Sequence, residues 1–315
     1  MRKTKDYILL VLKGIGMGAA DVIPGVSGGT IAFITDIYEE LIDSLKSINL
    51  DSLKLLLAGQ FKKFWEAING NFLLALFGGI IISLVSLAKL FHYLLHAHPI
   101  QIWSFFFGLI LISSLWVLNK ISKWNVITIL AAILGVAIAY FITSATPATT
   151  PEHPLFIFFS GAIAICAMIL PGISGSFILL ILGKYEFMLT SLKDVNILVI
   201  LTFMAGCVAG LLTFVRVVSW FLKKFHNQTI GLLAGFMVGS LYKIWPWKKT
   251  LSFIANSKGE QVPFIQENIL PTKYLSQTGE DPHILSALFF FALGIIIVVS
   301  LEKIAKYLKE SKKYA

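Results

Sequence analysis

Two short segments of the chain combine helix breakers with small and hydroxyl-bearing residues. Each follows a Pro-Gly pair, and the small and hydroxyl-bearing members are Ser27, Gly28, Gly29 and Thr30 in the first segment and Ser174, Gly175 and Ser176 in the second. A helix that restarts after such a break presents free N–H groups and the positive end of its dipole. That combination binds anions, phosphate in particular, and glycine allows a ligand to approach the backbone. We therefore predict phosphate binding at both segments, with close helix packing by small residues as the alternative.

Three acidic residues lie near these segments. Asp21 lies three residues before Pro24 within an apolar stretch, and an acid at membrane depth is a functional candidate. Glu39 and Glu186 each lie twelve residues past the serine of their segment. That spacing is about 18 Å along a helix, which places both near a membrane surface. We predict roles in proton coupling or headgroup contact. The alternatives are a helix cap or a pairing with a neighbouring helix at Asp21, and interfacial helix ends at the two glutamates.

Two basic residues could assist in holding an anion. Lys89 and Arg216 both fall in the last turns of apolar runs. They are predicted either as paired clamps for phosphate or as anchors whose charged ends reach the membrane surface. The histidines and the two cysteines have no metal-ligand spacing, so we expect no metal site and no cofactor.

The composition is typical of a membrane protein. Hydrophobic residues make up 57% of it and charged residues only 14%, against about 25% charged residues in a typical soluble domain. The net charge of +9 comes from lysines and arginines placed between apolar runs and at the termini. This is the pattern of cytoplasmic loops of a membrane protein, and it argues against a nucleic-acid partner.

The sequence contains an internal repeat. Residues 24–28 recur as 171–175, an offset of 147 (171 − 24), and the same offset pairs 38–39 with 185–186. Further along, Gly79 pairs with Gly206 at an offset of 127 (206 − 79), so the first half carries about twenty extra residues near 51–70. The insert has the lysine and apolar pattern of an amphipathic interfacial helix.

These patterns predict an all-α polytopic membrane protein built from two repeats, residues 1–150 and 151–315. Each repeat is expected to hold one re-entrant Pro-Gly helical hairpin and three transmembrane helices. The apolar run after the second break, 173–182, is only ten residues long, which is in the re-entrant range. The predicted hairpins are 7–45 and 155–192, the interfacial helix is 51–70, and the predicted spans are 71–92, 101–118, 126–143, 197–222, 229–245 and 284–301. Two full crossings per hairpin would fit the charge pattern equally well.

The distribution of basic loops predicts orientation. Lysines and arginines gather at the N-terminus, in 46–63, at 120–123, at 223–224 and after 303, whereas loops 92–100 and 144–154 have neither. By the positive-inside rule both termini are cytoplasmic, and each repeat crosses an odd number of times. The second repeat is then inverted relative to the first, as in many secondary transporters.

The motifs resemble those of a known family. Residues 18–30 followed by Tyr38-Glu39, and residues 168–176 followed by Tyr185-Glu186, are similar to two signatures of the polyprenyl-phosphate transporter family, and 239–247 is similar to a third. This resemblance implies a bacterial cytoplasmic-membrane flippase. Its substrate would be undecaprenyl phosphate, returned from the outer to the cytoplasmic leaflet for cell-envelope synthesis.

Two other functions remain open at this point. Broken helices with glycine and serine at an anion site also suit a small-anion channel or exchanger. The run Pro24-Gly25-x-Ser27 is similar to part of a polyprenyl-pyrophosphate phosphatase motif, but Gly28 stands where that motif has arginine. Phosphoryl transfer needs positive charge at the transferring group, so an enzyme is not expected. The oligomeric state cannot be predicted from these features.

Overall fold

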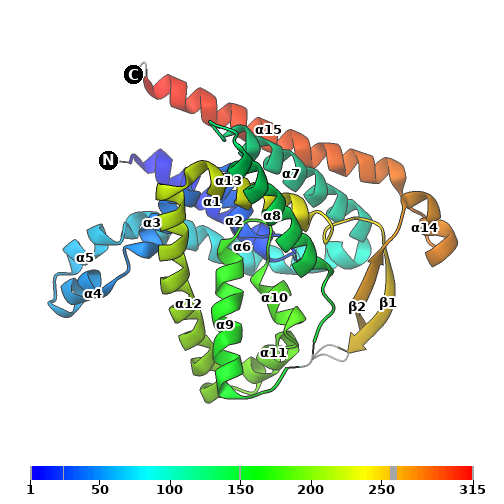
Figure 1. Cartoon of the computed structure of the whole chain (residues 1–315), viewed down its shortest axis with the longest axis horizontal. Helices are drawn as coiled ribbons and strands as arrows, with labels where there is room; N and C mark the ends of the chain where they lie inside the picture. The colour runs from blue at the N-terminus through cyan, green and yellow to red at the C-terminus, as the bar shows by residue number, and fades with distance from the viewer. Residues whose placement is uncertain (1, 24, 149, 256–260, 314–315) are drawn as a thin grey trace.

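The computed structural model describes residues 2–23, 25–148, 150–255 and 261–313 (Figure 1). Pro24, which the sequence places at the first helix break, lies outside the described residues. The first half contains eight helices in the described residues: α1 (Thr4–Asp21), α2 (Gly28–Ile34), α3 (Tyr38–Lys46), α4 (Leu50–Leu57), α5 (Phe61–Ala67), α6 (Gly70–Ala97), α7 (Pro99–Asn119) and α8 (Val126–Ser144). The second half contains α9 (Pro154–Ile169), α10 (Gly175–Ile181), α11 (Tyr185–Lys193), α12 (Ile197–Lys224), α13 (His226–Ser240), β1 (Lys248–Ala255), β2 (Gln261–Asn268), α14 (Pro271–Thr278) and α15 (Ile284–Lys313).

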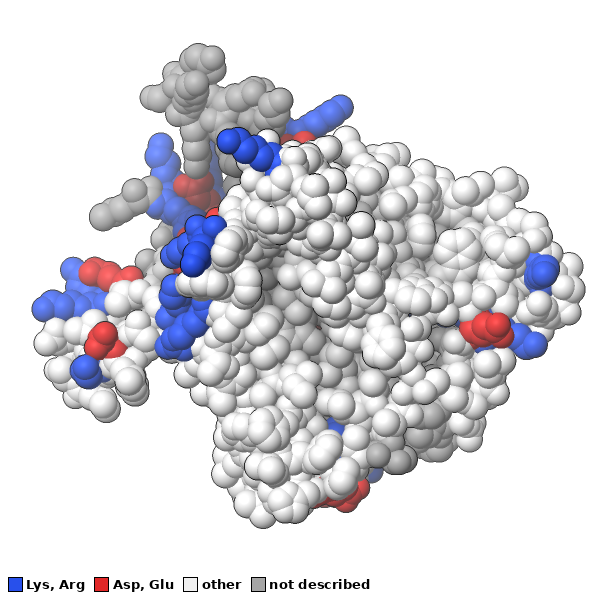
Figure 2. All heavy atoms as spheres, viewed as in Figure 1, with Lys and Arg blue, Asp and Glu red and all other residues white. Residues whose placement is uncertain are grey.

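The helices define a multi-pass membrane protein. Within the described residues, α6, α7, α8 and α12 are long and apolar enough to cross a bilayer, and the bent pair α10–α11 is a broken span or a re-entrant loop with a 105° bend. Many large apolar side chains on these helices face outward, as lipid-facing residues do (for example Leu74, Ile129 and Leu201). Figure 2 shows the corresponding broad uncharged face, with charged side chains confined to its margins.

Several helix boundaries differ from those predicted. The insert at 51–70 forms two short helices, α4 and α5, because Gly59 adopts a left-handed conformation (φ 71°) between them. The span predicted at 229–245 ends as a helix at Ser240, and those predicted at 71–92 and 284–301 continue to Ala97 and Lys313.

The segment 248–282 adds a two-stranded hairpin to a fold that is all-α, as predicted. Strands β1 and β2 pair as an antiparallel hairpin, with Lys248 opposite Asn268, and α14 follows directly. In Figure 1 this hairpin lies on the opposite side of the molecule from α4 and α5. The hairpin is a small addition to an otherwise helical fold.

Helix contacts recur at matched positions in the two halves. A Cβ added to Gly14 of α1 would meet the carbonyl oxygen of Leu76 on α6, and one added to Gly161 of α9 would meet that of Phe203 on α12. The two glycines are 147 positions apart (161 − 14) and the two carbonyls 127 (203 − 76). The same two spacings that align the sequences therefore align the contacts, and glycine is required at both because the backbones touch.

The last helix of each half packs on the other half. Gly108 of α7 meets the backbone of Phe291 on α15, and Gly235 of α13 meets that of Ala132 on α8. The two glycines are again 127 positions apart (235 − 108). The pairs α7–α15 and α8–α13 are among the most extensive helix contacts of the described chain. The two halves are therefore interlaced, not set side by side.

Candidate functional site

Both helix breaks turn at a glycine in the left-handed region. Gly25 has φ 92° and Gly172 has φ 87°, conformations that a residue with a Cβ adopts only under strain. After each turn one short helix begins, α2 with Ser27 as its N-cap and α10 with Ser174 as its N-cap. Ser27 has the typical capping bond, in which its Oγ accepts the N–H of Gly29 at 3.1 Å.

The first N–H groups of α2 already have partners within the chain. Gly28 donates its N–H to Oδ1 of Asp21 at 2.7 Å, Gly29 donates to Ser27 Oγ, and Thr30 donates to the carbonyl oxygen of Ser27 at 2.9 Å. Asp21 therefore caps α2 from across the helix break. A helix cap was one of the alternatives that the sequence left open for this residue. A carboxylate occupies the place that the sequence assigns to a phosphate, so in this conformation an external anion must displace it.

The two breaks meet tip to tip. The Ser27 hydroxyl lies 3.2 Å and 3.1 Å from the carbonyl oxygens of Met168 and Leu170, to which it donates. Thr30 Oγ1 accepts the N–H of Gly172 at 3.0 Å. Ser27 and Thr30 are both 0% exposed. A single polar junction in the protein interior thus joins segments more than 140 residues apart in sequence.

Gly29 and Gly175 stand where their helices approach other backbones. A Cβ at Gly29 would lie 2.7 Å from the carbonyl oxygen of Ile169, and one at Gly175 would lie 2.7 Å from that of Ala164. At these two positions glycine therefore allows close packing of the backbones, which was the alternative to anion binding.

The second break has more available hydrogen-bonding capacity. The hydroxyls of Ser174 and Ser176 lie 2.8 Å apart, and the Ser174 side chain makes no capping bond to its helix. Ser174 is 5% exposed, and Ser176 is partly buried. Two adjacent hydroxyls that bond mainly to each other can both reorient toward an anion.

One basic side chain that the sequence analysis did not single out lies against both breaks. Lys243, in the turn after α13, passes over the first tip, with its Cγ 2.9 Å from the position of a Cβ at Gly25. Its ammonium lies 4.5 Å from the ring centroid of Phe177 on α10. The only signal in the sequence was a lysine at the edge of a predicted span, in Tyr242-Lys243-Ile244.

The other predicted residues lie apart from this junction. Lys89 and Arg216 are both exposed on their helices, and Arg216 donates to the carbonyl of Leu212 on its own helix. Glu39 is exposed and lies 3.8 Å from His226, while Glu186 is partly buried at the start of α11. The structure therefore gathers the breaks and Asp21, and it does not gather the predicted clamps or the two glutamates.

A network of ion pairs connects α3 and its flanks to other segments. Asp43 accepts from Lys223 of α12 at 3.0 Å and from the hydroxyl of Ser219 at 2.9 Å. Three further pairs belong to this end of the molecule: Arg2–Glu40, Lys120–Asp36 and the His226–Glu39 contact. These segments are the ones whose basic residues predicted a common membrane side.

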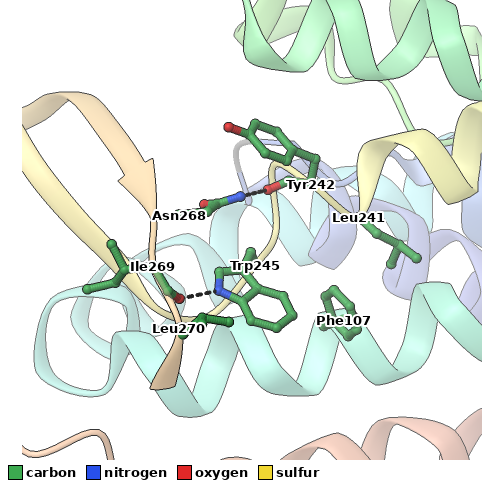
Figure 3. Close-up of a pocket in the computed structure, with 7 residues that line it drawn as sticks. All are labelled: Phe107, Leu241, Tyr242, Trp245, Asn268, Ile269 and Leu270. Carbon is green, nitrogen blue, oxygen red and sulfur yellow. Dashed lines mark hydrogen bonds between the residues drawn. The ribbon is translucent and has the colours of Figure 1, made fainter. Parts of the chain in front are cut away.

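A separate apolar pocket of about 360 Å³ lies at the base of the β-hairpin (Figure 3). It is lined by Phe107, Leu241, Tyr242, Trp245, Asn268, Ile269 and Leu270. Trp245 faces Phe107 and donates its Nε1–H to the carbonyl oxygen of Ile269 at 2.9 Å. No charged side chain lines this pocket, so it is not a phosphate site. Within the described residues there is also no cluster of His, Cys, Asp and Glu able to hold a metal ion.

Paired broken helices inside an apolar helical bundle define a class of membrane protein found among secondary transporters. The family model described as undecaprenyl phosphate translocase-like matches residues 17–262, and the chain belongs to that family. A protein of Vibrio cholerae named polyprenyl-phosphate transporter is 48% identical over 304 residues, covering 96% of this chain and 99% of that protein. A protein of the same name from Staphylococcus aureus is 34% identical over 255 residues, covering 75% of this chain and 85% of that protein. No solved structure matches the chain.

Proposed function

We propose that the chain transports polyprenyl phosphate across a bacterial membrane. It returns undecaprenyl phosphate from the outer to the cytoplasmic leaflet, so that the lipid carrier re-enters cell-envelope synthesis. The observation that carries this proposal is the polar junction between the two helix breaks, Thr30 to Gly172, inside an apolar bundle. The family match and the names of both relatives support the choice of substrate.

The phosphate is proposed to bind at the junction. The hydroxyls of Ser174 and Ser176 and the backbone at Gly175 form the part with spare hydrogen-bonding capacity. At the first break, Ser27, Gly28, Gly29 and Thr30 join the site when the phosphate replaces the Asp21 carboxylate on the Gly28 N–H. Lys89 and Arg216 are proposed to draw the headgroup from each leaflet, since both are exposed on spanning helices.

The two halves are proposed to have inverted orientations in the cytoplasmic membrane, with both termini cytoplasmic. The matched glycine contacts support a repeat, and the positive-inside pattern supports its inversion. The two hairpins are proposed to be re-entrant, and the short helices α2 and α10, seven residues each, support this form.

Alternating access is proposed to follow from a difference between the halves. Helix α3 packs on α12 and is bonded to it through Asp43, whereas the equivalent pair, α11 and α6, makes no comparable packing contact in the described chain. Exchange of the α3–α12 contact for an α11–α6 contact would close one side and open the other. The site at the junction would then face each leaflet in turn.

Asp21, Glu39 and Glu186 are proposed as the coupling or headgroup residues. Asp21 is the strongest of the three because its carboxylate holds the first N–H of α2. Asp21→Asn keeps an oxygen acceptor and removes the titratable charge. We expect folded protein with transport that no longer depends on pH, measured in liposomes as uptake of polyprenyl phosphate between pH 5 and 8. Unchanged pH dependence would remove Asp21 from the coupling scheme.

The function itself is tested by ligand binding to the purified full chain in detergent. We expect undecaprenyl phosphate to raise the unfolding temperature, and the double variant Ser27→Ala/Ser174→Ala to lose most of that shift. Stabilisation by chloride equal to that by the lipid would favour an anion channel. Release of inorganic phosphate from undecaprenyl pyrophosphate would favour a phosphatase, and either result would overturn the proposal.

A further inference from the structure

Lys243 differs from the other buried or paired basic residues of the protein. Lys223 bonds to Asp43, Arg2 bonds to Glu40, and Lys184, which is 2% exposed, donates to the carbonyl oxygen of Thr150 at 2.7 Å. The partly buried Lys243 ammonium has no carboxylate within 4.0 Å and no hydrogen bond in the part of the chain that the structure describes. Its contact is the ring of Phe177.

An ammonium removed from water without an anion is costly. A partly buried ammonium loses some of its water contacts, and an aromatic face replaces only part of that stabilisation. Proteins keep charged groups at membrane depth mainly where they pair or meet a ligand. The unused donors of Lys243 therefore point to an anion that is supplied from outside the chain.

The backbone is shaped to admit this side chain. Its Cγ lies where a Cβ on Gly25 would clash, and the left-handed φ of Gly25 excludes most other residues as well. The position of Lys243 is fixed by its own N–H, which bonds to Ser240 at 2.9 Å, and by Lys248, whose ammonium donates to the Lys243 carbonyl at 2.6 Å.

We propose that Lys243 is the cationic contact for the phosphate headgroup of the transported lipid, reaching across Gly25 to the start of the second broken helix. This inference rests on the proposed function and adds a residue to it. Lysine is a common phosphate ligand, and an ammonium that contacts the Phe177 ring on one side can offer its donors to phosphate oxygens on the other. The recognised group is a phosphate monoester on an apolar tail.

The test uses the full chain in detergent and compares three ligands: undecaprenyl phosphate, undecaprenol, which has the same tail without phosphate, and inorganic phosphate. We expect Lys243→Gln to weaken binding of undecaprenyl phosphate about 10- to 100-fold, the range expected for loss of a charged hydrogen bond. Binding of undecaprenol should be unchanged, and Lys243→Arg should bind the phosphate lipid more tightly than Lys243→Gln. If inorganic phosphate binds to the unmodified chain and not to Lys243→Gln, the phosphate group alone is sufficient for binding at Lys243.

Lys184→Gln is the matched control, because Lys184 is also a buried lysine beside a phenylalanine ring (Phe187, 5.3 Å) but bonds to a backbone carbonyl. It should bind the phosphate lipid as the unmodified chain does. Lys243→Met, of similar length and no charge, serves as a second neutral variant if Lys243→Gln does not fold.

Two outcomes would overturn the inference. If the neutral variants bind undecaprenyl phosphate within twofold of the unmodified chain, the phosphate contact lies elsewhere and the transport function stands. If they lose undecaprenol and undecaprenyl phosphate equally, Lys243 has a structural role. If the unmodified chain does not prefer the phosphate lipid to undecaprenol, the proposed function fails first.

Discussion

Thr30 Oγ1 accepts the backbone N–H of Gly172 at 3.0 Å, and this bond joins the broken helices of the two halves in the protein interior. Thr30 is 0% exposed, so no water can replace the acceptor when it is removed. The bond is one of three hydrogen bonds across the junction, with those from Ser27 to Met168 and Leu170.

Thr30→Val removes the oxygen and keeps the shape of the side chain. A buried N–H without a partner costs about 1–3 kcal/mol, so we expect a lower unfolding temperature in detergent. Thr30→Ser keeps the oxygen and should lose less. Equal losses in the two variants would show that the methyl group, not the hydrogen bond, stabilises the junction.

Gly79→Ala tests the contact between α1 and α6. The added Cβ would meet the carbonyl oxygen of Val11, and overpacking of this kind costs about 1–3 kcal/mol. Gly206→Ala, which meets Phe158 in the second half, should destabilise to a similar extent. Gly78→Ala is the control, since nothing lies within 4 Å of its Cβ, and helix propensity alone predicts a gain of up to about 1 kcal/mol. A neutral Gly79→Ala would contradict the close approach of these helices.

Asp43→Asn tests whether the α3–α12 contact acts as a gate. The Asp43–Lys223 pair is about half exposed, so its removal should change the unfolding temperature little. We expect instead a change in the transport rate, because the pair links the two halves and must break in each cycle. Asp51→Asn, which removes the exposed Asp51–Lys54 pair outside this contact, is the control. Equal transport rates in both variants would exclude a gating role.

The Arg2–Glu40 pair predicts a pH dependence of stability. Burial raises the pKa of Glu40, but hydrogen bonds from Arg2 and Asn69 outweigh this effect and hold the pKa below its ordinary value of 4.5. A lowered carboxyl pKa stabilises the folded state above pH 4.5, and that contribution is lost as the pH falls below it. Glu40→Gln should therefore lower the unfolding temperature at pH 7 and have a smaller effect near pH 3.5. The reverse order would show that the pair does not stabilise the fold.

The parts of the fold that repeat in the sequence were predictable from it. Two helix breaks and a bundle of apolar helices follow from residues 24–28 and 171–175 and from the apolar runs, and Gly79 and Gly206 marked a real helix contact in each half. These features are local or duplicated, so sequence spacing alone records them.

The remaining features depend on tertiary contacts. The β-hairpin at 248–268 has a weak strand pattern with a bulge near Ser252, and its pairing was missed. Lys243 contacts Gly25 and Phe177, which are distant from it in sequence. No spacing pattern in the sequence predicts these contacts. Whether Asp21 caps a helix or couples protons depends on the partner of its carboxylate, which the fold places at Gly28.

The interlaced final helices have a consequence for biogenesis. The contact face of α7 at Gly108 is covered by α15, whose Phe291 is synthesised 183 residues later (291 − 108). During translation α7 therefore enters the membrane before α15 can cover the backbone at Gly108. The contact of α8 with α13 can form earlier, because α13 precedes α15 in the sequence. A chain that stops before α15 would keep the α8–α13 contact between the halves and lack the α7–α15 contact. Such a chain would expose the backbone at Gly108, which α15 covers in the complete fold.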